Sequence, residues 1–145
     1  EVGTSQGYSA IWMGLGLQET GGRLTTIEVD PGRHALAQRN VREAGLAGQF
    51  LLIRGDAHTE IPGLRGPFDF VFFDADKDGQ MDYFQKLHPA KLAPGAIIVV
   101  HNAVSAAGDL KEYTEMIRRH PEYDTVTVST TMDDGMCLSY RRRAA

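Results

Sequence analysis

The densest group of chemically active side chains lies just after the apolar run Phe68–Phe73. Three carboxylates and one lysine occur there in the order Asp74-Ala75-Asp76-Lys77-Asp78. Carboxylates at alternate positions suit a hard divalent cation, and a lysine beside a cation can act as a base. The structural alternative is a charged loop that caps a helix, which fits Asp78 well. The run therefore predicts a metal or proton-transfer site centred on Asp74 and Lys77.

A second polar pair, His101-Asn102, follows the apolar run Ala96–Val100. An imidazole and an amide oxygen at a strand end could complete a metal site if Asp74 ends the neighbouring strand. A histidine with a structural role is the alternative. The remaining histidines lack such a context and are expected on the surface or in loops: His34, His58, His88 and His120.

The first nine residues, Glu1-Val2-Gly3-Thr4-Ser5-Gln6-Gly7-Tyr8-Ser9, resemble the end of a strand, a turn and the start of a helix. Gly3 and Gly7 permit a tight turn and the close approach of a ligand to the backbone. The N-terminus of the helix offers N–H groups to an anionic group. The spacing differs from the G-x-G-x-x-G dinucleotide fingerprint, which weighs against a nicotinamide cofactor. An ordinary turn is the alternative.

Two further acids follow predicted strands. A carboxylate at Glu28 could accept both hydroxyls of a ribose, and Asp30 accounts better for the cap of the next helix. Asp56 follows Gly55 and would lie near the edge of an adenine, or simply in a turn. Ligands of open α/β sheets bind beyond the carboxyl ends of the strands, so these acids predict a cofactor site there.

Short apolar runs alternate with amphipathic helices, which predicts an α/β fold with a mostly parallel sheet and helices on both faces. The predicted helices are Tyr8–Leu17, a segment from Pro31 to a stop at Gly45, Met81–Leu92 (with Pro94-Gly95 as its stop) and Leu110–Arg119. The predicted strands are Leu24–Val29, Gln49–Ile53, Phe68–Phe73 and Ala96–Val100. Thr125–Val128 and Gly135–Tyr140 would form an antiparallel hairpin, with the turn in Met132-Asp133-Asp134-Gly135.

The composition limits the class of protein. A chain of 145 residues with 42% hydrophobic residues fits a single domain with a real core. The net charge of -4 argues against a nucleic-acid partner, and we expect the basic run Arg141–Arg143 to be a solvated tail. The longest apolar run is too short to span a membrane and no signal peptide is visible, so a cytoplasmic location is expected. The lone Cys137 is expected to be a buried core thiol.

Taken together, the sequence resembles the cation-dependent S-adenosylmethionine O-methyltransferases, the class that contains catechol and caffeoyl-CoA O-methyltransferases. The resemblance runs from Glu1 to about Asn102 and is carried by Glu1–Ser9, Thr26-Ile27-Glu28 and Phe73–Asp78. It implies a Rossmann-like class I methyltransferase fold, with residues 1–145 as a single domain that lacks the family's N-terminal helices. It also implies S-adenosylmethionine and a divalent cation as cofactors, a small-molecule methyl acceptor and a possible homodimer.

The resemblance further implies roles for individual residues. Asp74 and Lys77 would be the catalytic residues. The metal ligands would be Asp74, Asn102 and His101. Residues around the cofactor would be Glu1, Gly3, Thr4 and Ser9 at the methionine part, Glu28 at the ribose, Asp56 and Ala57 at the adenine, and Asp74 at the amino group.

One departure from the family keeps alternatives open. The family usually has Asp-Asn where this chain has His101-Asn102, and the lost carboxylate removes charge that magnesium prefers. The site could take manganese, zinc or iron, or no metal. Three functions follow: metal-assisted transfer of a methyl group to a hydroxyl of an adjacent-dihydroxy aromatic, metal-independent transfer with His101 as base, or a non-catalytic module that binds S-adenosylmethionine.

Overall fold

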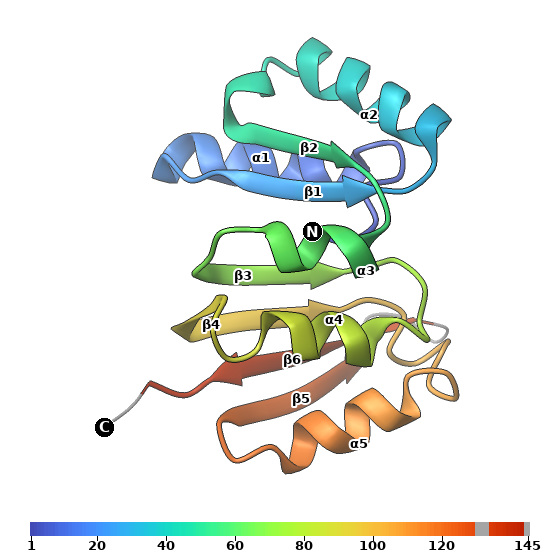
Figure 1. Cartoon of the computed structure of the whole chain (residues 1–145), viewed down its shortest axis with the longest axis vertical. Coiled ribbons are helices and arrows are strands. Elements are labelled where there is room, and N and C mark those ends of the chain that lie inside the picture. Colours follow the sequence, from blue (N-terminus) through green and yellow to red (C-terminus); the bar gives the residue numbers. More distant parts are fainter. Residues whose placement is uncertain (130–133, 144–145) are drawn as a thin grey trace. The chain divides into compact units, whose positions relative to one another are not determined.

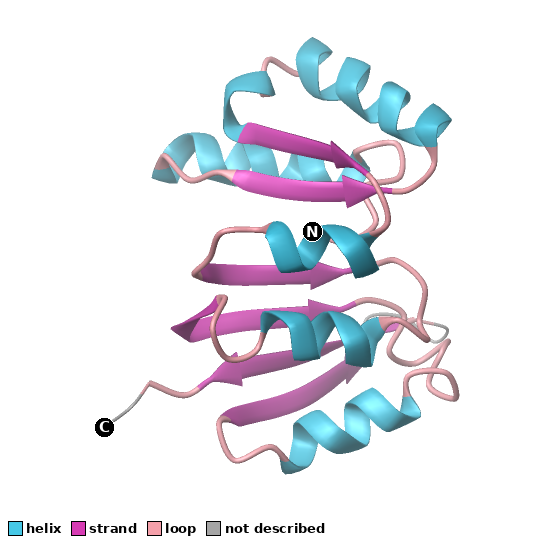
Figure 2. Cartoon of the chain, viewed as in Figure 1, coloured by secondary structure: helices cyan, strands magenta, loops and turns pink. Residues whose placement is uncertain are grey.

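The computed structural model describes residues 1–129 and 134–143. The predicted turn residues Met132 and Asp133 lie outside the described residues. The chain forms two compact units, Glu1–Glu60 and Ile61–Ala145, and each has its own strands and helices (Figures 1 and 2).

The first unit is built on two parallel strands, β1 (Leu24–Glu28) and β2 (Phe50–Arg54). Val2 adds a parallel bridge to Ile27 of β1, as expected for the end of a strand. The connections are α1 (Tyr8–Thr20), α2 (Pro31–Glu43), a short 3-10 helix (Ala47–Gln49) and the four-residue α3 (Ala57–Glu60). Because β1 and β2 run in the same direction, Glu28 and Arg54 end them side by side.

The start and stop of α2 agree with the sequence prediction. Asp30 caps the helix, because its Oδ1 accepts a hydrogen bond from the N–H of Arg33 at 2.7 Å. Gly45 follows the helix with a φ of 73°, a left-handed conformation that favours glycine. The surface or loop position expected for His34 is wrong, since α2 buries this side chain together with Ala37 on one face.

The second unit contains a four-stranded sheet in the order β3-β4-β6-β5 (Figure 1). Its strands are β3 (Phe68–Phe73), β4 (Leu92–Val100), β5 (Tyr123–Ser129) and β6 (Gly135–Arg141). β3 and β4 are parallel, and β6 runs antiparallel to both β4 and β5, which confirms the predicted C-terminal hairpin. A 3-10 helix (Ile61–Gly63), α4 (Gln80–Leu87) and α5 (Lys111–Arg119) complete the unit.

The predicted end of α4 was wrong. The helix ends at Leu87 instead of Leu92, and His88 is already extended with φ -83° and ψ 141°. Pro89 explains the early end, because a proline disfavours the helical conformation of the residue before it and has no N–H to donate. Leu92 belongs to β4 and pairs with Phe68, so Pro94-Gly95 lies inside a strand and does not stop a helix.

The sheet of the second unit has two unequal faces. Ile98 is 0% exposed, whereas its neighbour Ile97 is 40% exposed. The alternation follows from the period of two in a strand, which directs successive side chains to opposite faces. Tyr113 and Ile117 of α5 are buried, as the sequence predicted.

Polar contacts near the C-terminus differ from the sequence expectation. Arg141 does not belong to a solvated tail, because it lies in β6 and its guanidinium donates to the carboxylate of Glu122 and to the carbonyl of Leu92. The hydrogen bond from Arg141 holds the pKa of Glu122 below its usual value.

His88 and His120 follow α4 and α5, as expected, and both rings contact Phe84. Among the described residues, no helix has the length and apolarity needed to cross a membrane.

Ile98→Ala should destabilise the protein by about 2–5 kcal/mol, because it removes a fully buried side chain and leaves a cavity. Ile97→Ala removes the same atoms from the adjacent, partly exposed position and should cost far less. Urea denaturation of both variants measures the difference. Equal losses of unfolding free energy would contradict the assignment of the two faces.

Cys137 should resist thiol reagents in the folded protein. Its side chain is 0% exposed in β6, and burial raises the pKa of its thiol, so the reactive thiolate is scarce. Titration with a chromogenic disulfide at pH 8 should detect no thiol until denaturant is added. Rapid labelling of the folded protein would be inconsistent with this core position.

Candidate active site

The loop between Val2 and α1 is fixed against the end of β1. The N–H groups of Gly3 and Thr4 both donate to the carbonyl of Ile27, at 3.0 and 3.2 Å. Gly7 turns the chain into α1 with a φ of 88°, and no side chain caps the start of this helix. A first turn without a side-chain cap suits contact with an anionic group.

Four hydroxyl and carboxyl groups connect this loop to β1. The carboxylate of Glu1 accepts hydrogen bonds from the hydroxyls of Ser9 and Thr26, each at 2.5 Å. The hydroxyl of Thr4 lies 2.5 Å from that of Thr26, and because Thr26 gives its only proton to Glu1, Thr4 must be the donor. Thr4 and Thr26 are buried, so these bonds satisfy groups that would otherwise be costly to bury.

Glu28 lies at the end of β1 with only 6% of its surface exposed. One carboxylate oxygen accepts from the N–H of Ser5 at 2.7 Å, and the other accepts from the N–H of Asp30 at 2.9 Å. The side chain therefore holds the loop before α1 and the start of α2 at the same strand end. A carboxylate oxygen has two acceptor positions, so these bonds leave capacity for further hydroxyl donors.

Asp56 follows β2 and caps α3. Its Oδ1 accepts from the N–H of His58 at 2.8 Å, and its carbonyl accepts from Thr59 and Glu60. Asp56 therefore lies in a turn, which the sequence analysis gave as the alternative to a contact with adenine. Ala57 beside it is buried, as the first residue of α3.

In the second unit, the parallel pairing of β3 and β4 brings two of the predicted site residues together. Phe73 lies opposite Val100 at the ends of these strands, and the N–H of His101 donates to the carbonyl of Phe73 at 3.0 Å. The next side chains therefore meet, with His101 Nδ1 2.8 Å from Asp74 Oδ1.

Lys77 joins this pair, whereas Asp76 does not. Lys77 Nζ lies 3.5 Å from Asp74 Oδ1, and its side chain is 17% exposed. Asp76 accepts a hydrogen bond from the hydroxyl of Tyr83 at 2.5 Å, and its carbonyl accepts from the amide of Gln80, so it fixes the loop before α4. The two carboxylates at alternate positions of the motif thus have separate roles: Asp74 contacts Lys77, whereas Asp76 holds the loop before α4.

The other side of His101 faces Asp134, a residue that the sequence analysis treated only as part of a turn. His101 Nε2 lies 2.9 Å from Asp134 Oδ2. Asp134 Oδ1 accepts from the N–H of Gly135 at 2.7 Å and from the amide of Asn102 at 3.5 Å. No spacing rule signalled this contact, because Asp134 becomes a neighbour of His101 only through the antiparallel pairing of β6 with β4.

The side chains predicted to bind a metal contact one another and Asp134 in this structure. Both ring nitrogens of His101 lie within hydrogen-bonding distance of a carboxylate oxygen, at 2.8 Å from Asp74 and 2.9 Å from Asp134. Asp74 Oδ1 already faces two nitrogen atoms, Lys77 Nζ and His101 Nδ1. Within residues 1–129 and 134–143, no group of three or more histidine, cysteine or acidic side chains is arranged to hold a metal ion.

The predicted site residues thus form two groups, each described within its own unit. Four of the residues predicted to bind the cofactor, Glu1, Thr4, Ser9 and Glu28, hold the loop before α1 or the end of β1 in the first unit. Asp74, Lys77, His101 and Asn102 gather at the ends of β3 and β4 in the second unit, with Asp134 as an unforeseen member. The sequence also gave no role to Thr26, whose hydroxyl contacts both Glu1 and Thr4.

Comparisons with known proteins agree with these features. Residues 1–103 match a family described as a methyltransferase domain. The chain is 43% identical over 109 residues to the catechol O-methyltransferase of Niastella koreensis, a match that covers 72% of this chain and 48% of that relative. It is 35% identical over 143 residues to the catechol O-methyltransferase of Mycobacterium tuberculosis, covering 90% and 64%. The chain therefore spans about half to two thirds of the length of these curated relatives.

A solved structure supports the same assignment. The O-methyltransferase from Bacillus cereus in complex with SAH superposes with a TM-score of 0.88 and 26% identity, over 97% of this chain and 72% of that one. The predicted Rossmann-like class I methyltransferase fold is thereby confirmed. The chain belongs to the methyltransferase domain family, in the group that contains the catechol O-methyltransferases.

Proposed function

We propose that this protein is an S-adenosylmethionine-dependent O-methyltransferase that methylates a hydroxyl group of a small molecule. The observation that carries the proposal is the end of β1, where buried Glu28 ties the loop before α1 to the start of α2. The named activity of the relatives and the SAH bound to the Bacillus cereus enzyme support it.

The cofactor would lie over the loop and the strand end of the first unit. Glu28 would accept the two ribose hydroxyls with the acceptor positions that the N–H groups of Ser5 and Asp30 leave unused. Glu1, Gly3, Thr4 and Ser9 would surround the methionine part. Asp56 and Ala57 would flank the adenine, and Asp74 would approach the amino group.

Methyl transfer requires an attacking oxygen that has lost its proton. S-adenosylmethionine supplies the methyl group on a sulfonium, which leaves as a neutral thioether while the new C–O bond forms from an oxygen lone pair. Lys77 would receive the hydroxyl proton at Nζ, and Asp74, 3.5 Å away, would orient that amine. An adjacent-dihydroxy aromatic is the acceptor class that we propose, because both curated relatives are named catechol O-methyltransferases.

A divalent cation at Asp74, His101 and Asn102 has less support than the cofactor. Both ring nitrogens of His101 face carboxylates, so we assign proton removal to side chains of the protein. The alternatives of a non-catalytic binding module and a homodimer stay predictions.

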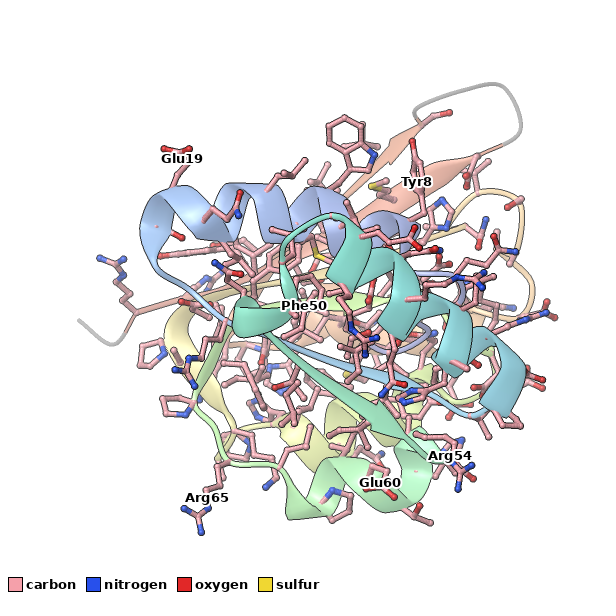
Figure 3. All side chains as sticks on the ribbon, turned by 90° about the horizontal axis from the view of Figure 1, so that it is seen from above. Tyr8, Glu19, Phe50, Arg54, Glu60 and Arg65 are labelled. Carbon is pink, nitrogen blue, oxygen red and sulfur yellow. The ribbon has the colours of Figure 1, made fainter. Side chains whose placement is uncertain are left out.

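Glu28→Gln should weaken binding of S-adenosylmethionine and SAH by about 10- to 100-fold, because hydrogen bonds to a charged group contribute about 1.5–3 kcal/mol. Isothermal titration calorimetry measures this change. Glu19→Gln is the matched control, since Glu19 is exposed at the opposite end of α1 from Tyr8 (Figure 3). Thermal melting of both variants separates lost affinity from lost folding. A folded Glu28→Gln protein with unchanged affinity would exclude the ribose role.

Lys77→Met should lower the rate of methyl transfer by about 10²–10⁴-fold, the usual contribution of a positioned acid or base, and leave cofactor affinity unchanged. The assay follows SAH formation with a panel of 1,2-dihydroxybenzenes. Lys86→Met provides the control, because Lys86 forms an ion pair with Asp82 within α4. If Lys77→Met turns over at the rate of the Lys86→Met control, another group removes the proton.

A further inference from the structure

We propose that Tyr83 is a positioning residue for the reaction, because it holds the two residues that directly precede Asp74 and Lys77 in the chain. The proposal rests on the O-methyltransferase function proposed above, in which Lys77 takes the proton. It concerns the second unit alone, where the loop of residues 74–79 joins β3 to α4 (Figure 1). Tyr83 would act through this loop and would not touch the substrate.

The ring of Tyr83 fixes the beginning of the loop. Tyr83 lies near the start of α4, and its side chain is only 1% exposed. The ring contacts that of Phe73, with 5.7 Å between the ring centroids and 46° between the ring planes. Phe73 is the last residue of β3 and is fully buried, so the backbone from which Asp74 emerges is packed against Tyr83.

The hydroxyl of Tyr83 fixes the middle of the same loop. It donates a hydrogen bond to Asp76 Oδ1 at 2.5 Å, and the carbonyl of Asp76 accepts a second hydrogen bond from the side-chain amide of Gln80 at 3.0 Å. A hydroxyl on a buried side chain is costly unless it is paired, so the folded chain needs this bond. Asp76 is thereby held through its side chain and its backbone, directly before Lys77.

The packing at Gly79 shows how closely Tyr83 and Asp76 approach the end of the loop. A Cβ atom at this position would overlap Asp76 Oδ2 and would lie 2.8 Å from the hydroxyl oxygen of Tyr83. The φ of Gly79 is -77°, which other residues adopt readily, so the glycine is needed for space and not for its backbone conformation. The contact between Tyr83 and Asp76 therefore leaves no room for a side chain at Gly79.

The proposed catalytic pair depends on where this loop lies. Lys77 Nζ lies 3.5 Å from Asp74 Oδ1, and lysine carries its amine on a flexible four-carbon chain. The amine stays close to a substrate hydroxyl only if the backbone that carries it is fixed, since a displacement of about 1 Å can cost about 100-fold in rate. Tyr83 holds that backbone at Phe73 and at Asp76, so one side chain sets the spacing between Asp74 and Lys77.

The test compares Tyr83→Phe with Tyr113→Phe in the formation of SAH from S-adenosylmethionine and a 1,2-dihydroxybenzene. Tyr83→Phe keeps the ring and removes only the hydroxyl. We expect kcat to fall about 10- to 100-fold, while the KM of the acceptor and the affinity for S-adenosylmethionine change by less than about threefold. Tyr113 is the matched control, because it is a second buried tyrosine of this unit but lies on α5. Tyr113→Phe should leave kcat unchanged.

Variants of Asp76 show whether the hydrogen bond itself carries the effect. Asp76 is exposed, so these changes remove the bond without opening a cavity in the core. Asp76→Asn keeps an oxygen that can accept from the Tyr83 hydroxyl and should retain most of the rate, whereas Asp76→Ala should lose as much as Tyr83→Phe. Combining Tyr83→Phe with Asp76→Ala should cost no more than the slower single variant, because both changes remove the same interaction. Losses that multiply, or equal losses in Asp76→Asn and Asp76→Ala, would contradict the role of this bond.

Hydrogen exchange reports on the loop without any turnover. The N–H of Gln80 donates to the carbonyl of Lys77, and the N–H of Tyr83 donates to the carbonyl of Gly79. Amide exchange of residues 76–83 should be about tenfold faster or more in Tyr83→Phe, because a hydrogen bond to a charged group is lost next to them. Exchange in α5 should not change. Thermal melting of every variant shows whether the fold is intact.

The outcomes separate this proposal from the proposed function. Unchanged exchange of residues 76–83 in Tyr83→Phe, or faster exchange with an unchanged kcat, would overturn the positioning role and leave the methyltransferase function standing. Cofactor binding by the unaltered protein without transfer to any acceptor would count against the function. The exchange measurement would then still decide whether Tyr83 holds the loop.

Discussion

The parallel pairing of β3 with β4 is the constraint on which the chemistry of the second unit depends. It places Phe73 opposite Val100, so the residues that follow each strand emerge at one edge of the sheet. The bond from the His101 N–H to the Phe73 carbonyl continues this pairing by one residue. Asp74 and His101 must therefore meet, and the other contacts of the group depend on where these two side chains lie.

The end of β1 shows how hydrogen bonds can hold a loop in place without a packed core of its own. The hydroxyls of Thr4, Ser9 and Thr26 and the carboxylate of Glu1 satisfy one another, so the loop can be partly buried at little cost. Glu28 holds the same loop from the other side through the N–H of Ser5. A loop fixed in this way loses little conformational freedom when a ligand binds, which favours affinity.

Local sequence signals predicted much of the fold. The start and end of α2 could be predicted from the sequence, because the residues that set them lie within one turn of the helix ends: Asp30, Pro31 and Gly45. The end of α4 was missed because apolar periodicity continued to Leu92, while the stop came from Pro89. His34 was misplaced because a polar residue type suggested the surface, whereas the face of α2 on which it lies is buried.

The candidate site was less predictable, because its decisive contact is long-range. Asp74 and His101 follow neighbouring strands, and a parallel sheet implies their meeting. Asp134 precedes a strand that inserts antiparallel next to β4, and neither its residue type nor its spacing from His101 indicates that insertion. An imidazole next to Asn102 in the sequence indicates a metal ligand, because imidazole is a common ligand of metal ions in proteins. The structure adds a second carboxylate on the other side of the ring, so both ring nitrogens of His101 face carboxylates, and the predicted metal ligand contacts side chains of the protein in this structure.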